Sequence, residues 1–397
     1  MMTKKRMLFN RRAIFLLFSG FLFYSYSLSW PISESVGNQP GPAEEVLGSR
    51  PSYVQYAAFI AGISTPQGPM AAFENRPAWV HLAKFFDQNW GKYDTKQLAP
   101  MKEWAARELS AAVSSKLTVF YPFSGPDFVN PYTLFPNAGT YVLAALEPVG
   151  GIPEFQAMSD QDFDSFFDDL QHSLHDVLSI DYFISAHMHA AMEGKELKGV
   201  LPILLFFMAR EKARILDVEY WFMEPDGTIE QVPAAGRVKP AHAGAIPGVR
   251  IVFESAGQPG QRQTLYYFQL NFYNATFQRN GHFIAFLKSL GPLITFTKSA
   301  SYVMFNPEAS AVRGFVLDQS RYVLQEDSGI PLTYFDPSVW TLQFYGAYTE
   351  PISIFKYDLQ ADLAQIYGAG VNIKPLPFGI GYHFQAGTSN LMLATRK

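Results

Sequence analysis

The 397-residue chain has no cysteine, few charged residues and no excess of positive charge. Without cysteine there is no disulfide, no thiolate metal site and no cysteine nucleophile. The formal net charge of -4 and the lack of a basic stripe argue against nucleic acid as a partner. Hydrophobic residues make up 48% and charged residues 17%, which excludes a disordered chain. The sequence therefore indicates a folded body that its hydrophobic core alone has to stabilise.

Complete catalytic signatures are also missing. The chain has no phosphate-binding Gly-x-x-x-x-Gly-Lys-Ser/Thr loop, no His-Glu-x-x-His and no Gly-x-Ser-x-Gly. The segment from Ser353 to Lys356 spells Ser-x-x-Lys, but the companion motifs of β-lactamases are absent. Two Gly-x-Gly words, at 368–370 and 379–381, lack the third glycine of a dinucleotide-binding fingerprint. No reaction class follows from motifs.

The N-terminus has the pattern of an export signal. Five basic residues within 1–12 precede an apolar run at 13–24, and small residues before Trp30 offer a cleavage point. We expect residues 1–30 to be a signal peptide or an inner-membrane anchor (13–30), followed by a linker at 31–52 that is rich in Pro, Gly and Ser. The twin arginines Arg11 and Arg12 leave both the general and the twin-arginine export routes open. The protein is expected to be periplasmic or secreted, and to meet a membrane only through this segment.

The body reads as an α/β fold. The runs 116–123 and 140–146 are apolar without alternation, which is typical of strands buried on both faces of a parallel sheet. Helical patterns at 52–63, 78–89 and 96–113 predict an N-terminal helical layer, and Ser159–Ile180 is the clearest helix. The short run Val200–Met208 is predicted to be a core strand.

Turn signals between Ile215 and Tyr273 predict an inserted β-hairpin region, after which strands and helices alternate again. The fold expected is a mainly parallel or mixed sheet with Rossmann-like strand–helix–strand units. Tyr-Val-Leu followed by Gly-Ile-Pro occurs twice, from Tyr141 to Pro153 and from Tyr322 to Pro331. This repeat is either a duplicated strand–helix–strand unit or a coincidence of short, common sequences. The body at 53–397 is therefore one unit or two halves, 53–213 and 214–397.

The strongest candidate site combines polar residues that follow apolar strands. Carboxyl ends of parallel strands meet at one edge of a sheet, where open α/β folds bind ligands. We predict catalytic carboxylates and, beside them, ligand-binding residues. The carboxylates are Asp127, Glu147, Glu326 and Asp327; the ligand-binding residues are Ser124, Gly125 and Lys298.

Such carboxylates can do three things. Two of them with separated pKa values can act as acid and base in hydrolysis, with Asp127 or Glu147 as base and Glu326 or Asp327 as acid. Three or more can hold a divalent metal, the one cofactor that the sequence leaves open. The structural alternative is that Ser124 or Asp127 only caps a helix with Pro126 in its first turn.

A second, weaker candidate is a histidine-rich stretch between His172 and Glu193. His172 and His175 lie opposite the apolar stripe of their helix and are expected to be solvated. His189 and Glu193 are one helical turn apart, so they are the pair that could bind a metal.

Three short segments, at 121–128, 146–150 and 325–331, are similar to segments of other proteins. They resemble a group of exported bacterial proteins of unassigned function, over most of the body, and the resemblance implies no chemistry. The strand–Gly–helix–strand–acid order, with Glu147 about 20 residues after Asp127, also looks like the opening of a Rossmann-type nucleotide fold. The glycines of that fold are missing here, and export argues against a nucleotide-derived methyl donor.

Together these patterns predict an exported envelope or secreted protein with an acid-lined cleft at the strand ends, which hydrolyses or binds a small polar ligand. If it is an enzyme, it is a hydrolase that uses carboxylates with or without a divalent metal. The alternative is a membrane-tethered structural or interaction protein that meets an envelope partner through aromatic surface.

Overall fold

The computed structural model describes residues 52–192, 196–233 and 244–397. Residues Gly48–Lys397 form one compact unit. The predicted signal segment and nearly all of the predicted linker lie outside the described residues. Within the described part, no helix combines the length and the apolar character that a bilayer crossing needs.

One mixed sheet organises the unit and confirms the α/β class. Its eleven described strands run in the order β10-β9-β11-β8-β7-β1-β2-β6-β5-β3-β4. Because this sheet contains strands from both sides of residue 213, the two predicted halves share it. The strands are β1 (Thr118–Pro122), β2 (Thr140–Ala145), β3 (Arg214–Met223), β4 (Ile229–Pro233), β5 (Ile246–Glu254), β6 (Arg262–Gln269), β7 (Leu293–Thr297), β8 (Ser320–Gln325), β9 (Trp340–Gly346), β10 (Ile373–Lys374) and β11 (Asn390–Arg396).

The five central strands, β8, β7, β1, β2 and β6, are parallel to one another. The prediction of parallel strands at 116–123 and 140–146 is confirmed: Val119 lies beside Tyr141 in that register. Both strands are buried on both faces, which explains their unbroken apolar sequence. The predicted hairpin region is also present, as the antiparallel strands β3 to β6.

Two strand–helix–strand units diverge from the middle of this sheet. The unit β1–α6–β2, with α6 at Val129–Leu134, steps toward β6; the unit β7–α12–β8, with α12 at Ser310–Gln319, steps toward β11. The two helices pack on opposite faces, because α6 shares a core with Tyr121 and α12 shares the other core with Phe120. The strand order therefore reverses between β1 and β7, which is the topological switch point of the sheet. That the units are Rossmann-like stays a prediction.

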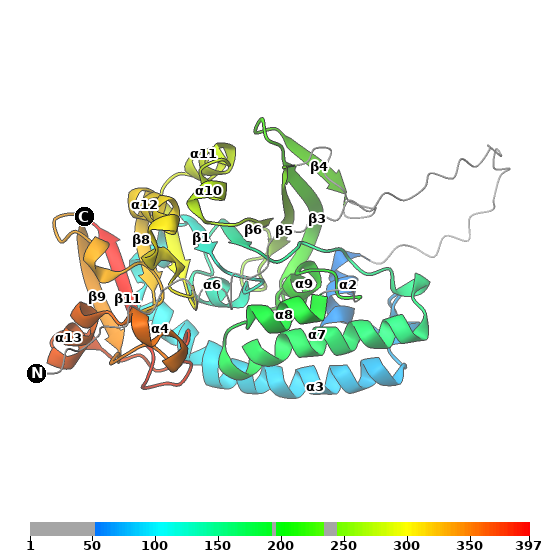
Figure 1. The fold of residues 1–397 in the computed structure, drawn as a ribbon. Coiled ribbons are helices and arrows are strands. Elements are labelled where there is room, and N and C mark those ends of the chain that lie inside the picture. The colour runs from blue at the N-terminus through cyan, green and yellow to red at the C-terminus, as the bar shows by residue number, and fades with distance from the viewer. Residues whose placement is uncertain (1–51, 193–195, 234–243) are drawn as a thin grey trace, which may run out of the picture. The chain divides into compact units, whose positions relative to one another are not determined.

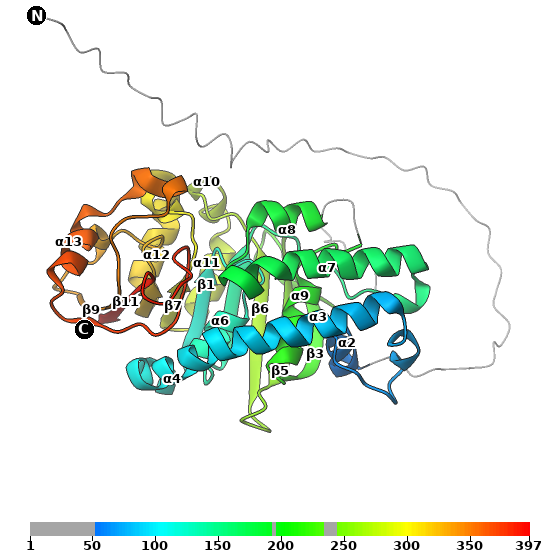
Figure 2. The ribbon, with the colours of Figure 1, turned by 90° about the horizontal axis from the view of Figure 1, so that it is seen from below.

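One face of the sheet carries the helices from the first half of the chain (Figures 1 and 2). The helix predicted at 159–180 is confirmed: Ser159 caps its N-terminus, and its Phe and Leu stripe is buried. In Figure 2 it runs alongside α3. The helices of this layer and their neighbours are α2 (Tyr53–Ile60), α3 (Pro77–Tyr93), the π-turn η2 (Asp94–Leu98), α4 (Ala99–Glu108), α5 (Ser110–Ser114), α7 (Asp160–Ile180), α8 (Ser185–Met192) and α9 (Leu201–Arg210).

Shorter helices from the second half cover the other face (Figure 1). The pattern at 276–290 predicts one helix, and the structure divides it into two at Gln278–Asn280. The elements of this part are α10 (Asn274–Phe277), α11 (Gly281–Ser289), η4 (Val303–Phe305) and η5 (Pro307–Ala309), with η6 (Leu332–Tyr334), η7 (Ser353–Asp358) and α13 (Ala361–Ala369) toward the C-terminus.

The prediction of a core strand at Val200–Met208 is wrong, because this segment is the helix α9. Its residues are buried all round, so the sequence has no polar face and no helical period. Pro202 stands in the first turn, where a missing N–H costs nothing, and it is the local signal for a helix start. The predicted strand at 293–305 is also too long, since β7 ends at Thr297.

Both edges of the described sheet are short or interrupted. The edge strand β10 has two residues, and its Lys374 forms an ion pair with Glu108 (2.8 Å, Nζ to Oε2). The opposite edge strand, β4, has five residues and ends at Pro233, which has no N–H to donate.

Candidate functional site

A buried ion pair occupies the switch point of the sheet. Asp127 follows β1, and Lys298 follows β7 directly. The Lys298 Nζ lies 2.9 Å from the Asp127 Oδ2, and each side chain is 2% exposed. Because neighbouring parallel strands end at the same edge, the two turns bring these charges together as the sequence predicts.

A second carboxylate reaches the same lysine from the helical layer. Asp181 ends α7 in a left-handed conformation, with φ of 63°, and it is buried. Its Oδ2 lies 3.3 Å from the Lys298 Nζ, and its backbone carbonyl also accepts a hydrogen bond from this ammonium group. The turn between α7 and α8 therefore closes over the switch point. The lysine network is defined here as Tyr93, Tyr121, Asp127, Asn130, Asp181 and Lys298.

The other members of the lysine network hold its carboxylates. The Tyr121 hydroxyl donates to Asp127 (3.1 Å), and the Tyr93 hydroxyl donates to Asp181 (2.5 Å). The Asn130 amide donates to both, at 3.0 Å to the Asp127 Oδ1 and 3.2 Å to the Asp181 Oδ1. Asp127 Oδ1 also accepts the backbone N–H of Asn130 (3.2 Å) in the first turn of α6. The structural alternative holds only in part, because the N-cap residue is Phe128 and Pro126 lies before the helix.

The electrostatics of the lysine network follow from burial and charge balance. Burial alone would lower the pKa of Lys298, but the two carboxylates raise it above its ordinary value, so the ammonium form is retained. Burial raises the pKa of Asp181, and Lys298 opposes that shift. Burial, then the charge of Asp181, raises the pKa of Tyr93 well above its usual range, so its hydroxyl stays a donor.

A pair of acids follows the next strand, β8. The acid pair, Glu326 and Asp327, is buried, at 2% and 1% exposed. Glu326 Oε1 accepts the backbone N–H of Ser299 (3.0 Å), while no described residue donates to its Oε2. Asp327 accepts hydrogen bonds from the Asn390 amide (2.7 Å) and the Tyr302 hydroxyl. Burial, followed by the charge of Asp327, raises the pKa of Glu326 well above its usual range, which favours a protonated carboxyl.

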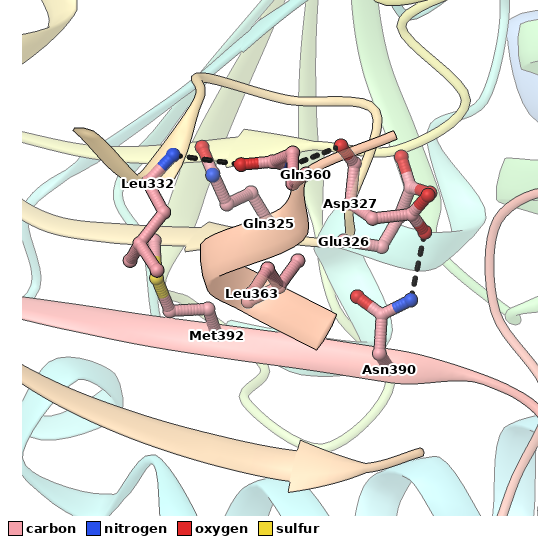
Figure 3. A pocket seen from close by; sticks show the side chains of 8 residues that line it. All are labelled: Gln325, Glu326, Asp327, Leu332, Gln360, Leu363, Asn390 and Met392. Atoms are coloured by element: carbon pink, nitrogen blue, oxygen red, sulfur yellow. Dashed lines mark hydrogen bonds between the residues drawn. The ribbon is translucent and has the colours of Figure 1, made fainter. Parts of the chain in front are cut away.

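The acid pair borders a small cavity that both polar and apolar residues line. Its volume is about 10 Å³, roughly the room that one water molecule needs. Figure 3 shows the side chains of Asp327, Asn390 and Gln360 around it, with the dashed bonds that fix the Gln360 amide and the Asp327 carboxylate. The acid pair and the lysine network are neighbours, because the charges of Asp127 and Glu326 both act on the buried Tyr121 hydroxyl.

The turns after β1 and β7 hold strained backbone. The backbone is left-handed at Phe123 (φ 62°), Ser299 (φ 52°), Ser301 (φ 50°) and Tyr302 (φ 52°). Residues other than Gly, Asn and Asp rarely adopt this conformation. Such residues cluster at ligand sites, where the surrounding structure holds them. Here the turn after β7 supplies both Lys298 and the backbone N–H of Ser299, which donates to Glu326.

A C-terminal loop, residues 375–389, covers the acid pair. Gly381 has a φ of 66°, and a Cβ at this position would lie 2.6 Å from the Glu326 Cγ. The next residue, Tyr382, donates to the Ser299 carbonyl (3.1 Å) and lies 2.8 Å from the Ser301 Oγ. The loop therefore sits directly on the acids and on the strained turn.

The remaining predicted site residues lie nearby in different roles. Ser124 is buried and donates to the carbonyl of Gly125 (2.8 Å), whose φ of 53° makes the turn after β1. Glu147 lies at the end of β2, half-buried, and its carbonyl accepts the Tyr267 hydroxyl (2.8 Å). It belongs neither to the lysine network nor to the acid pair as defined here.

The sequence reasoning missed several members of the site. Tyr93 and Asp181 come from helix ends, and Asn390 begins β11, so no strand-end pattern marks them. Asn130 had a signal: it is a polar residue inside the apolar stretch 128–135, and it is fully buried.

The histidine-rich stretch is mostly solvated. His172 and His175 are exposed, as predicted, and the His187 Nδ1 lies 2.8 Å from the Asp176 Oδ2. Glu193 lies outside the described residues, and His189 is described only as part of the backbone of α8. In the part of the chain that the structure covers, no three His, Asp or Glu side chains are placed to hold a metal ion.

No protein-family model matches the chain, and no curated protein or solved structure matches it. The function therefore has to be argued from the chemistry of the site rather than from relatives.

Proposed function

We propose that this is an exported protein that hydrolyses a small polar compound outside the cytoplasm, at the acid pair beside the lysine network. One observation carries the proposal: five ionisable side chains are buried together at the carboxyl edge of the sheet. Burying charges costs several kcal/mol per ion, and hydrophobic residues of similar volume are often at least as stable. Such a cluster at a topological switch point is therefore a candidate for function. The five are Asp127, Asp181, Lys298, Glu326 and Asp327.

The two acids are suited to different roles. Glu326, with its raised pKa, is the proton donor to the leaving group. Asp327 borders the water-sized cavity, so its carboxylate takes the proton of the attacking water. Because the two residues are adjacent, the proton then returns from Asp327 to Glu326 and the site is restored. Lys298 supplies a fixed positive charge nearby, held by Asp127 and Asp181.

Access requires that the cover moves. The parts that lie over the site are the α7–α8 turn at Asp181 and the loop at Gly381–Tyr382. Both are held to the strand ends by a few polar contacts, so a substrate with polar groups can replace these contacts as it enters. This restricts the proposed substrate to a small, polar molecule.

The export part of the proposal rests on the N-terminal sequence, with its basic residues before an apolar run. Hydrolysis suits an extracytoplasmic site because it needs no imported cofactor. The resemblance to exported bacterial proteins points the same way.

The test is turnover by the purified body. p-Nitrophenyl esters, phosphates and glycosides give a coloured product on hydrolysis, so one plate reader assay covers the three classes. The wild type is expected to hydrolyse at least one class, and Glu326→Gln is expected to lower kcat by about 10²- to 10⁴-fold, the usual contribution of a general acid. The matched control is Glu308→Gln, which makes the same change at an exposed acid on η5 and should leave kcat unaltered.

Two results would contradict hydrolysis at this site. One is an absence of turnover with all three classes, and the other is equal turnover by the wild type and Glu326→Gln. Thermal unfolding of each variant shows whether a loss of activity is only a loss of folding.

A second function is favoured by one observation on the surface. Ile354 (51% exposed), Tyr357 (73%) and Leu359 (49%) are large apolar side chains close together in sequence on and after η7. Exposed apolar residues of this kind mark protein contacts. If the protein is instead an interaction module, native mass spectrometry of material from its own host should show an oligomer or a second protein. Replacing these three residues by serine should then release it.

A further inference from the structure

A larger cavity lies at the opposite, amino edge of the same sheet. Its volume is about 460 Å³, within the range of pockets that bind small molecules. Its walls come from α4, α5, the end of α6, the end of α9 and the turn between β5 and β6. Because β6 begins beside the beginning of β2, this turn stands at the edge where the central strands start.

This cavity is called here the amino-edge pocket. Thr133 lines it from α6 and is 3% exposed, and its Oγ1 has neither a hydrogen-bond partner among the described residues nor accessible surface toward the pocket. A buried hydroxyl without a partner costs about 1–3 kcal/mol. The neighbouring Tyr132 also lines the pocket and is largely buried.

The charges at the pocket are unbalanced. Glu211, with 9% of its side chain exposed, lies 3.2 Å (Oε2) from the Lys102 Nζ, and Asp94 lies 3.7 Å (Oδ1) from the same nitrogen. Two carboxylates thus share one ammonium group. Burial raises the pKa of Glu211 by more than the charges of Lys102 and Lys212 lower it, which means that these two lysines compensate its charge incompletely. A further positive charge near Glu211 would be stabilised.

Apolar side chains complete the walls. Ala105, Val113 and Pro136 line the pocket alongside the polar groups. A ligand that fits must therefore combine an apolar body with a positively charged group that donates hydrogen bonds to Glu211.

We propose that the amino-edge pocket binds a small organic amine, with its ammonium group at Glu211 and its apolar body against Ala105, Val113 and Pro136. This site is separate from the strand-end site, because the two lie at opposite edges of the central strands. The proposal therefore holds or fails independently of the proposed hydrolysis.

The test compares three probes of similar shape by isothermal titration calorimetry. They are 2-phenylethylamine, the neutral 2-phenylethanol and the anionic phenylacetate. The amine is expected to bind at least about tenfold more tightly than either analogue, which corresponds to about 1.4 kcal/mol. Glu211→Gln should abolish this preference. Glu103→Gln removes the same charge from an exposed position on α4 outside the pocket, and it should keep the preference.

A second variant keeps the proposal testable if Glu211→Gln does not fold. Ala106 is an exposed residue at the rim, so Ala106→Phe should fill the pocket and abolish amine binding while thermal unfolding stays unchanged. The proposal is overturned if the amine does not bind saturably, or if all three probes bind equally. It is also overturned if Ala106→Phe, folded as the wild type, binds the amine with unaltered affinity.

Discussion

The two edges of the central parallel strands are opposites. The carboxyl edge holds five buried ionisable side chains, two of which line a cavity of about 10 Å³, whereas the amino edge holds a pocket of about 460 Å³ where Lys102 pairs with two carboxylates. Lys298 is 2% exposed at the first edge, and Lys102 is 46% exposed at the second. One edge has charge without space, and the other has space with little charge.

This difference indicates which edge is suited to proton transfer and which to reversible ligand binding. Charges buried without water interact strongly and keep shifted pKa values, which suits proton transfer but requires the cover to move. An open pocket with few charges suits reversible binding of a molecule with an apolar body. Each of the following predictions tests one side of this contrast.

The largest effect is expected at the carboxyl edge, from Lys298→Met. The substitution leaves Asp127 and Asp181 buried without their counter-ion, so it should lower the free energy of unfolding by about 3–5 kcal/mol. Urea unfolding measures the change. The exposed Lys288→Met on α11 is the control and should stay within about 0.5 kcal/mol of the wild type. A loss below about 1 kcal/mol for Lys298→Met would mean that the network is far better solvated than its burial implies.

The second effect is a pH dependence from Glu326. Its pKa is raised in the folded state, whereas in the unfolded chain it is about 4.3. The folded state therefore holds the proton longer, and the stability from this group, complete below about pH 4.3, is lost as pH rises through the folded pKa. Because glutamine does not titrate, Glu326→Gln should gain stability relative to the wild type by at most about 1.4 kcal/mol per pH unit.

Urea unfolding between about pH 5 and pH 8 tests this slope. Glu308→Gln should follow the wild type across the same range. Part of the slope should remain in Glu326→Gln, since burial also raises the pKa of Asp181. Parallel curves for the wild type and Glu326→Gln would show that Glu326 is ionised in the folded protein.

A smaller effect is expected at the amino edge, and it is a gain in stability, whereas Lys298→Met causes a loss. Thr133→Val replaces a buried hydroxyl that has no described partner with a methyl group of the same shape, so it should stabilise the protein by about 1 kcal/mol. Calorimetric unfolding without added amine measures this gain, and the same variant should bind 2-phenylethylamine with unaltered affinity, because the buried Oγ1 does not reach the pocket. Destabilisation instead of a gain would show that the hydroxyl is hydrogen-bonded in the folded protein.

The smallest effect on stability is expected when the same lysine-to-methionine substitution is made at the amino edge. Lys102→Met should cost less than about 1 kcal/mol, because an ion pair with an exposed member contributes little. If the two lysine substitutions cost the same in urea unfolding, the contrast between the edges is wrong.

The sequence predicts those site residues that follow a strand along the chain. Asp127, Lys298, Glu326 and Asp327 follow segments that the sequence marks as strands, and parallel pairing gathers such residues at one edge. What the sequence does not provide is the helix-borne half of the lysine network. Asp181 reaches Lys298 only because α7 packs across the sheet and ends there, and no local pattern encodes that distance.

Helix α9 illustrates the limit for the fold. A segment that is buried on every side has no amphipathic period, so its length and one proline are all that separates a helix from a strand. The amino-edge pocket is beyond sequence reasoning for a related reason. Lys102, Thr133 and Glu211 come from three helices, and only tertiary packing places them around one cavity.

The blunt edges of the sheet determine how the body behaves at high concentration. Edge strands with free N–H and C=O groups recruit strands from other molecules, and this strand addition starts many fibres. Here β10 offers two residues, one of them the charged Lys374, and β4 ends at a proline. A second copy would find few backbone groups to pair with along β10 or β4, so these two strands limit the growth of the sheet between molecules without a disulfide or a closed barrel.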